Sequence, residues 1–263
     1  EVITMRFVRF ETRTLPPQYG WLLDNALGPV EGDIFSEYRR LEASIPLETA
    51  RLLAPVAPGK IICVGRNYVE HAREQGVEPP DIPLLFLKPP SSVIGPGEAI
   101  LLPPQSRQVE HEAELAVVIG RLGRWIPPEA ALDYVFGYTV ANDVTARDLQ
   151  RRDGQWTRGK GFDTFCPLGP WIETDYDPYD NLITCRVNGE IRQMASTRDM
   201  IFPVQQLVAF ASSVMTLEPG DVILTGTPAG IGPLLDGDEV AVDIEGIGEL
   251  RNPVKADVRQ LSV

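Results

Sequence analysis

Three glutamates spaced two residues apart open the segment 109–120 (VEHEAELAVVIG). In a β-strand, side chains two residues apart share a face and lie roughly 6–7 Å from each other, so Glu110, Glu112 and Glu114 would point the same way. The continuation 115–119 (LAVVI) is apolar on both faces, which is typical of a central, buried strand. An unpaired buried carboxylate is very costly, so the glutamates beside this strand need a cation. Their oxygens favour a hard divalent ion such as Mg²⁺ or Mn²⁺.

A third carboxylate ligand would have to come from a neighbouring strand end. The segment 140–150 (VANDVTARDLQ) places Asp143 where an apolar strand breaks into a polar turn. Taken alone, this aspartate is better explained by an Asx turn or a helix N-cap, which are common at such positions. An edge strand with one wet face is likewise the commoner explanation for an isolated Glu-x-Glu pair. The buried strand that follows the glutamates nevertheless favours a metal site.

The two histidines of the chain lie in different surroundings. His71 and Glu74 are spaced i,i+3 in a short helix predicted over 68–76 (YVEHAREQG), so their side chains can meet. A carboxylate beside an imidazole orients it and raises its basicity, which would give a general base for water or for a carbon acid. A solvated helix surface is the alternative. His111 alternates onto the face opposite the glutamates, and we expect it to be a core residue or a residue that supports the site.

The glycine-rich segment 225–232 (TGTPAGIG) follows an apolar strand. It lacks the Gly-Lys-Ser/Thr ending of a phosphate-binding loop. Thr227 and the neighbouring backbone N–H groups could still form an anion-holding turn. A tight turn before the next hairpin is the alternative.

The charge balance limits the possible partners. The chain has 37 acidic and 24 basic residues, a formal net charge of −13. Nucleic acids and anionic membranes both require a basic surface, so neither is an expected partner. Lysine occurs only at positions 60, 88, 160 and 255. In a chain that otherwise uses arginine, the remaining lysines favour places that need a compact, titratable ammonium group.

Composition also indicates the compartment. No apolar run approaches the ~20 residues of a membrane span, and we expect a soluble, cytoplasmic protein. The three cysteines, Cys63, Cys166 and Cys185, are too few and too dispersed for a disulfide framework or a zinc ribbon. We expect them to be reduced thiols in the core.

Short strands dominate the predicted elements. Residues 1–57 alternate apolar and polar in short bursts and predict a small β-rich N-terminal domain, followed by a second domain over 58–263. Asn188-Gly189 between two strand-like runs is typical of a type I′ hairpin turn. Residues 202–215 predict a helix with Pro203 in its first turn. Strict β-α-β alternation is missing, so we expect an α+β, β-rich fold.

The segments described above occur in an order that resembles the fumarylacetoacetate hydrolase family. The similar segments are 52–74, 83–103, 109–121, 137–150, 160–172, 216–232 and 244–254, and they include the short pieces GRNYVEH, FLKP, ARDLQ and KGFD. The resemblance implies a mixed β-sandwich roll as catalytic domain, usually in a homodimer. It also implies a divalent metal, Mg²⁺ or Mn²⁺, held by Glu112, Glu114 and Asp143. The longest family members have one more upstream aspartate ligand, and GRNYVEH supplies none, which indicates the short bacterial branch.

The resemblance further implies roles for the remaining candidates. His71 and Glu74 would be a water-activating dyad on a mobile lid. Lys160, a third catalytic residue, would stabilise developing negative charge. The implied substrate-binding residues are Lys88, Arg147 and Gln150, and Thr227 of the glycine-rich segment is a further candidate.

Such a site fits a 2-oxo acid or its enol, with catalysis through a stabilised enolate. The favoured substrate is 2-hydroxyhepta-2,4-diene-1,7-dioate, which the enzyme would isomerise or decarboxylate in the catabolism of aromatic compounds. Hydrolysis of acylpyruvates and decarboxylation of oxaloacetate are the alternatives, and a non-catalytic metal-binding scaffold is a remote third. A dicarboxylate would need an additional cation at its distal end, for which the candidates are Arg66, Arg151, Arg152 and Arg158.

Overall fold

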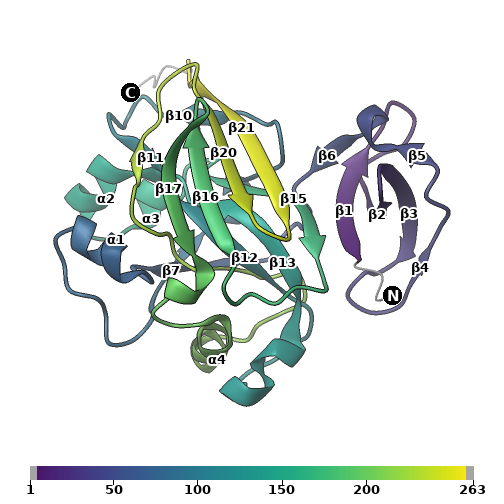
Figure 1. Cartoon of the computed structure of the whole chain (residues 1–263), viewed down its shortest axis with the longest axis horizontal. Coiled ribbons are helices and arrows are strands. Elements are labelled where there is room, and N and C mark those ends of the chain that lie inside the picture. Colours follow the sequence, from purple (N-terminus) through teal and green to yellow (C-terminus); the bar gives the residue numbers. More distant parts are fainter. Residues whose placement is uncertain (1–4, 259–263) are drawn as a thin grey trace.

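The computed structural model describes residues 5–258, and strands make up most of its regular structure (Figure 1). A mixed sheet of 13 strands runs through the molecule. Along its path lie β4 (Tyr38–Arg40), β3 (Ala26–Gly32), β2 (Gln18–Leu23), β1 (Arg6–Glu11), β15 (Cys166–Glu173), β13 (Val135–Asn142), β12 (Ala113–Ile119), β18 (Val222–Leu224), β7 (Ile61–Gly65) and β8 (Leu84–Lys88). Three short strands pair beside this path: β5 (Ile45–Pro46), β6 (Arg51–Leu53) and β9 (Val93–Ile94).

Two smaller sheets complete the β-structure. The five-stranded sheet has the order β10 (Ile100–Leu102), β21 (Gly248–Ala256), β20 (Glu239–Ile244), β16 (Leu182–Val187) and β17 (Glu190–Ser196). The three-stranded sheet has the order β14 (Thr145–Ala146), β11 (Val109–His111) and β19 (Gly232–Pro233). The fold is α+β and strand-rich, as predicted.

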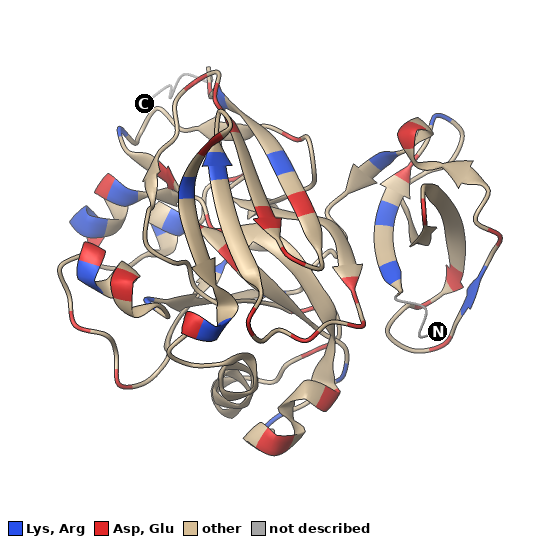
Figure 2. Cartoon of the chain, viewed as in Figure 1, with Lys and Arg blue, Asp and Glu red and all other residues tan. Residues whose placement is uncertain are grey.

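The α-helices are short and lie outside the sheets. They are α1 (Val69–Glu74), α2 (Arg147–Asp153), α3 (Thr157–Lys160) and α4 (Val204–Val214). Single 3₁₀ turns or short 3₁₀ helices occur at Leu47–Thr49, Pro90–Ser92, Pro128–Tyr134 and Thr197–Asp199. Figure 2 shows basic and acidic residues side by side on α1 and α2, whereas α4 carries no charged residue and buries one face in the core. Within residues 5–258, no helix is both long enough and apolar enough to cross a membrane.

Strand β12 is the centre of the hydrophobic core. Leu115, Val117 and Ile119 pack toward the five-stranded sheet and α4, while Ala116 and Val118 pack on the other face of the main sheet. All five side chains are fully buried. The prediction of a buried central strand is therefore confirmed, because both faces of β12 are covered.

The N-terminal strands form a small β-rich lobe at one side of the molecule (Figure 1). Val8, Phe10, Leu22 and Leu27 give this lobe a core of its own. It joins the rest of the chain through antiparallel pairing of β1 with β15, in which Phe7 lies opposite Ile172. The small N-terminal β-rich region is confirmed, and the boundary near residue 57 stays a prediction.

Several local predictions are confirmed. Strands β16 and β17 pair as a hairpin, and both Asn188 and Gly189 have a positive φ, of 53° and 81°, as a type I′ turn requires. Helix α4 follows Pro203, which occupies the N-cap position, one residue earlier than expected. All three cysteines are free and buried.

One strand prediction is wrong in a way that matters for the site. The segment 109–120 does not form a single strand but breaks at Glu112 into β11 and β12, which belong to different sheets. At the break, the Glu112 N–H donates to Asn142 Oδ1 (2.9 Å) and the Glu112 carbonyl accepts from the Asp143 N–H (2.8 Å). These bonds hold Glu112 beside the end of β13.

Candidate metal and substrate site

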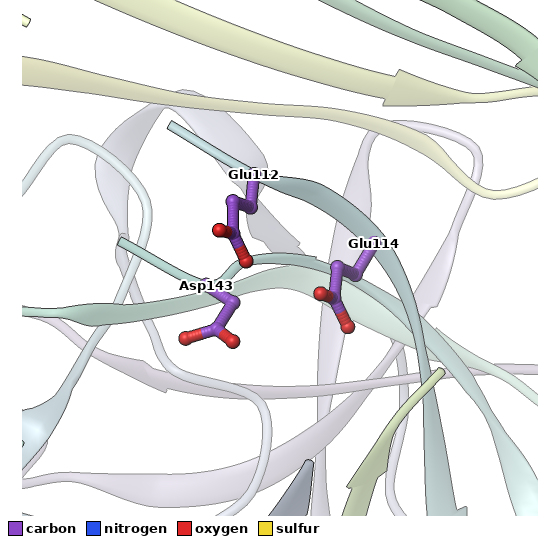
Figure 3. A group of neighbouring side chains, drawn as sticks. All are labelled: Glu112, Glu114 and Asp143. Carbon is purple, nitrogen blue, oxygen red and sulfur yellow. The ribbon is translucent and has the colours of Figure 1, made fainter. Parts of the chain in front are cut away.

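Three carboxylates converge where β12 begins and β13 ends (Figure 3). Glu112, Glu114 and Asp143 each offer an oxygen within 4.8 Å of the others. Their exposed fractions are 4%, 2% and 1%, so this cluster is almost completely shielded from water. The antiparallel pairing of Ala113 with Asn142 places the two strand ends side by side, which explains how residues about thirty positions apart meet.

Two lysines neutralise part of this charge. Lys160, at the end of α3, donates to Glu112 Oε2 (2.7 Å) and to Asp143 Oδ2 (2.6 Å). Lys88, at the end of β8, donates to Asp143 Oδ1 (2.5 Å) and to the Val144 carbonyl (3.1 Å). Burial opposes the charge of Lys160, but Asp143 and Glu112 hold its pKa above the usual value. Two of the four lysines thus lie at the carboxylate cluster, as their scarcity suggested.

Arg147 binds the outer side of Glu112. Its guanidinium donates to Glu112, to Glu110 Oε2 (2.8 Å) and to Gln150 Oε1 (2.6 Å). Glu110 does not join the cluster, because the chain breaks between β11 and β12. It is 6% exposed and accepts a hydrogen bond from Arg147.

Glu114 differs from the other two carboxylates because, within residues 5–258, no Lys or Arg forms an ion pair with it. The backbone N–H of Gly226 donates to Glu114 Oε2 (2.7 Å). Burial, reinforced by Asp143 and Glu112, raises the pKa of Glu114 well above its usual value. In Glu112, burial is outweighed by Lys160 and Arg147, so its pKa is lowered.

This asymmetry fits a divalent cation. When Glu114 is ionised, the three carboxylates of the cluster and Glu110 carry four negative charges. Lys88, Lys160 and Arg147 carry three positive charges, which leaves one negative charge without a counterion. A divalent cation would satisfy Glu114 and change the balance to one positive charge, which favours an anionic ligand. An all-oxygen set of donors is the kind that Mg²⁺ and Mn²⁺ prefer. Glu112, Glu114 and Asp143 are the residues that could hold it.

The His71–Glu74 pair lies on α1 at the same cavity. His71 is 3% exposed, so the expectation of a solvated helix surface does not apply to it. Its Nδ1 lies 3.2 Å from Glu74 Oε2, and its Nε2 lies 2.9 Å from Gln75 Nε2. The Gly230 N–H donates to Glu74 Oε1 (3.0 Å). Partial burial opposes the charge of Glu74, but its hydrogen bonds to His71 and Gly230 lower its pKa.

Thr227 lines the cavity, and its hydroxyl connects strand β12 with strand β17. Its hydroxyl donates to the Ala113 carbonyl (2.9 Å) and accepts from Gln193 Nε2 (2.7 Å). Gln193 Oε1 also lies 3.0 Å from His111 Nδ1 and accepts from the Ala113 N–H at the same distance. The sequence did not single out Gln193, because nothing distinguishes it from other polar residues of a hairpin.

The cavity itself is small, with about 10 Å³ of free space, roughly what one water molecule needs. The sequence did not single out five of the residues that line it and indicated a sixth, Arg66, only as one of several arginines. The five are Val64, Gly65, Gln75, Phe86 and Trp156. Of the other three arginine candidates, none lines the cavity, and Arg158 pairs with Asp153 on the surface.

The fold and the site together define a strand-rich protein with a buried acidic cluster and converging cations. Residues 60–255 match the family described as fumarylacetoacetate (FAA) hydrolase, C-terminal, and residues 5–55 match the family described as Rv2993c-like, N-terminal. The chain belongs to the fumarylacetoacetate hydrolase family.

Two relatives show how close this kinship is. The chain is 53% identical over 214 residues to Protein Rv2993c of Mycobacterium tuberculosis, which covers 80% of this chain and 81% of the relative. It is 48% identical over 231 residues to the mitochondrial oxaloacetate tautomerase Fahd2a of Rattus norvegicus, with coverages of 82% and 74%.

Solved structures agree over nearly the whole chain. The 2-hydroxyhepta-2,4-diene-1,7-dioate isomerase of Mycobacterium marinum has a TM-score of 0.90 and 44% identity, covering 97% of this chain and 100% of its own. Maleylpyruvate hydrolase of Sphingobium sp. SYK-6, solved with manganese(II) and pyruvate, has a TM-score of 0.79 and 33% identity, with coverages of 96% and 99%. The reactions named for these similar proteins differ, although they share one fold.

Proposed function

We propose that this protein is a divalent-metal-dependent enzyme that acts on a 2-oxo acid or its enol, with 2-hydroxyhepta-2,4-diene-1,7-dioate as the favoured substrate. The observation that carries the proposal is the buried cluster of Glu112, Glu114 and Asp143, in which Glu114 has no ion pair with Lys or Arg among the described residues. Isomerisation and decarboxylation of this substrate would both pass through an enolate.

The proposed metal is Mg²⁺ or Mn²⁺. When bound, such an ion supplies Lewis acidity, which stabilises negative charge on an adjacent substrate oxygen. Lys160 and Arg147 are already fixed by their hydrogen bonds, so they stabilise the same charge without reorganising during the reaction. Lys88 keeps Asp143 oriented, and Gln150 keeps Arg147 oriented.

Proton transfer is assigned to the His71–Glu74 dyad. In the tautomer that satisfies both contacts, His71 Nδ1–H donates to Glu74 and Nε2 accepts from the Gln75 amide. His71 can move a proton only through Nε2 in this arrangement, so Gln75 must release that nitrogen when substrate binds. The small free volume of the cavity supports such a movement of α1, because a substrate of seven carbons needs more room.

A second candidate function is hydrolysis of a C–C bond in an acylpyruvate. The His71–Glu74 dyad favours it, because an imidazole oriented by a carboxylate can activate water. Decarboxylation of oxaloacetate is a further reaction that the same enolate chemistry would serve. We propose a homodimer in either case, by analogy with the family.

An activity panel tests the proposal directly. Purified protein is assayed with 2-hydroxyhepta-2,4-diene-1,7-dioate, an acylpyruvate and oxaloacetate, each with added Mg²⁺ or Mn²⁺ and again after treatment with EDTA. We expect the highest kcat/KM with the heptadienedioate and loss of activity in EDTA that added metal restores. Activity that does not change with the chelator would contradict the metal assignment, and inactivity toward all three would contradict the substrate class.

A further inference from the structure

Arg66 is a cation that lines the cavity but does not bind the carboxylates described above. The other three cations around the cluster each bind at least one carboxylate. Arg66 lines the same cavity, yet within residues 5–258 it forms no ion pair and its buried Nε has no hydrogen-bond partner. A guanidinium without a counterion beside a shielded cavity, in a chain with a net charge of −13, is suited to receive an anionic group from outside the protein.

The backbone holds this side chain in an uncommon conformation. Arg66 has a φ of 59°, in the left-handed region that side chains other than Gly, Asn and Asp rarely adopt. The preceding residue is glycine, and a Cβ atom on Gly65 would lie only 2.7 Å and 2.9 Å from ring atoms of Trp156. The Gly65-Arg66 turn therefore brings Trp156 against the backbone and places the Arg66 side chain beside the Trp156 ring. Such strain is typical of functional sites.

Aromatic side chains form the wall next to Arg66. Its guanidinium carbon lies 5.6 Å from the centroid of the Trp156 ring, and Phe86 meets the same indole edge-on at a centroid distance of 5.1 Å. Lys160 Nζ lies 5.0 Å from the Phe86 ring centroid, so this wall connects Arg66 with the carboxylate cluster. Flat apolar surfaces between two cationic ends match a carbon chain that carries an anionic group at each end.

We propose that Arg66 binds the distal carboxylate of a 2-oxo dicarboxylic acid, while Trp156 and Phe86 pack against the carbon chain. The inference rests on the proposed function, because it places the 2-oxo acid end of the substrate at Glu112, Glu114 and Asp143. Arg66 is then a specificity-determining residue. It offers the paired N–H groups that bind a carboxylate through two parallel hydrogen bonds.

A matched pair of unreactive ligands isolates the distal group. 2-Oxoglutarate and 2-oxopentanoate have the same carbon chain and the same 2-oxo acid end, but only the first has a carboxylate at C5. Their binding to the Mg²⁺-loaded protein is measured by calorimetry. We expect the protein to bind 2-oxoglutarate more tightly. Arg66→Asn, which tolerates a positive φ, should weaken 2-oxoglutarate binding about ten- to a hundredfold and leave 2-oxopentanoate binding unchanged.

Controls separate the possible outcomes. Arg151→Gln removes an exposed arginine of α2 and should change the binding of neither acid. Arg66→Lys keeps the charge without the paired donors and should lose a smaller part of the preference, which tests the proposal even where Arg66→Asn fails to fold. Equal binding of the two acids by the unaltered protein, or equal losses in the Arg66 variants, would overturn the role of Arg66 alone. Binding of neither acid would overturn the proposed function as well.

Discussion

At the scale of single residues, the site depends on side chains whose charge is fixed by their neighbours. Glu112 is held ionised by Lys160 and Arg147, whereas burial beside Asp143 and Glu112 disfavours the charged form of Glu114. Two glutamates two positions apart therefore differ in their electrostatic state, although the sequence presents them as equivalents. The difference arises because Lys160 and Arg147 bind Glu112, whereas among the described residues no Lys or Arg forms an ion pair with Glu114.

Lys160→Met should reduce kcat about 10²–10³-fold, because it removes a preorganised donor near the charge that develops in the reaction. Steady-state kinetics with the best substrate of the activity panel measures the effect. Lys255→Met, which changes an exposed lysine, is the matched control and should keep full activity. Near-normal turnover by Lys160→Met would contradict its assigned role.

His71→Asn distinguishes hydrolysis of an acylpyruvate from decarboxylation of oxaloacetate. Hydrolysis of an acylpyruvate needs an activated water, whereas decarboxylation of oxaloacetate does not, so hydrolysis should fall further, by about 10²–10⁴-fold. The ratio of the two rates in the variant and in the unaltered protein is the measurement. An equal loss in both reactions would assign His71 to a step that they share.

At the scale of elements, the loop between β18 and β19 connects the carboxylate cluster with the His71–Glu74 dyad. The Gly226 N–H binds Glu114 and the Gly230 N–H binds Glu74. Both glycines have a φ near 100°, and a Cβ atom on Gly230 would lie 2.1 Å from the Arg192 carbonyl oxygen. This loop requires glycine at both positions for its path, and the two glycines supply backbone donors to the site.

Gly230→Ala should therefore move the donor that orients Glu74 and lower kcat by roughly ten- to a hundredfold, in addition to destabilising the fold. Gly237→Ala is a matched control, since its φ of 90° imposes similar strain while nothing lies within 4 Å of the added methyl group. The control should cost roughly 1 kcal/mol of unfolding free energy and leave kcat unchanged. Urea unfolding measures the stability of both variants, and steady-state kinetics measures their kcat. Equal kcat values for Gly230→Ala and Gly237→Ala would contradict the role of the loop.

At the scale of the whole molecule, the cluster joins segments that belong to different sheets. Glu112 lies between β11 and β12, and Asp143 lies between β13 and β14. A ligand that binds these carboxylates only in the folded state should therefore stabilise the whole fold.

Adding Mg²⁺ at about a hundred times its Kd should stabilise EDTA-treated protein by about 2.7 kcal/mol. For a chain of this size, that corresponds to a rise in Tm of roughly 5–10 °C. Glu114→Gln should lose most of this rise when compared with its own metal-free form. Glu129→Gln, at an exposed position, should keep it. An unchanged rise in Glu114→Gln would exclude Glu114 as a ligand.

The sequence by itself determined the local features of this protein. Alternation and apolar runs identified the central strand over 115–119, and Asn188-Gly189 identified the hairpin turn, because both depend on neighbouring residues. The residue types also indicated the chemistry, since carboxylates next to a buried strand call for a cation. Resemblance to the family supplied Asp143 and Lys160 as partners.

Only the tertiary structure decided which groups meet. Lys160 reaches Glu112 across 48 positions and Gly226 reaches Glu114 across 112, and both contacts depend on strand register and on the break at Glu112. In the folded chain, Glu110 pairs with Arg147, and Arg66 forms no ion pair among the described residues. Local patterns contain no information about such contacts, because sheet pairing and side-chain packing between distant segments fix them.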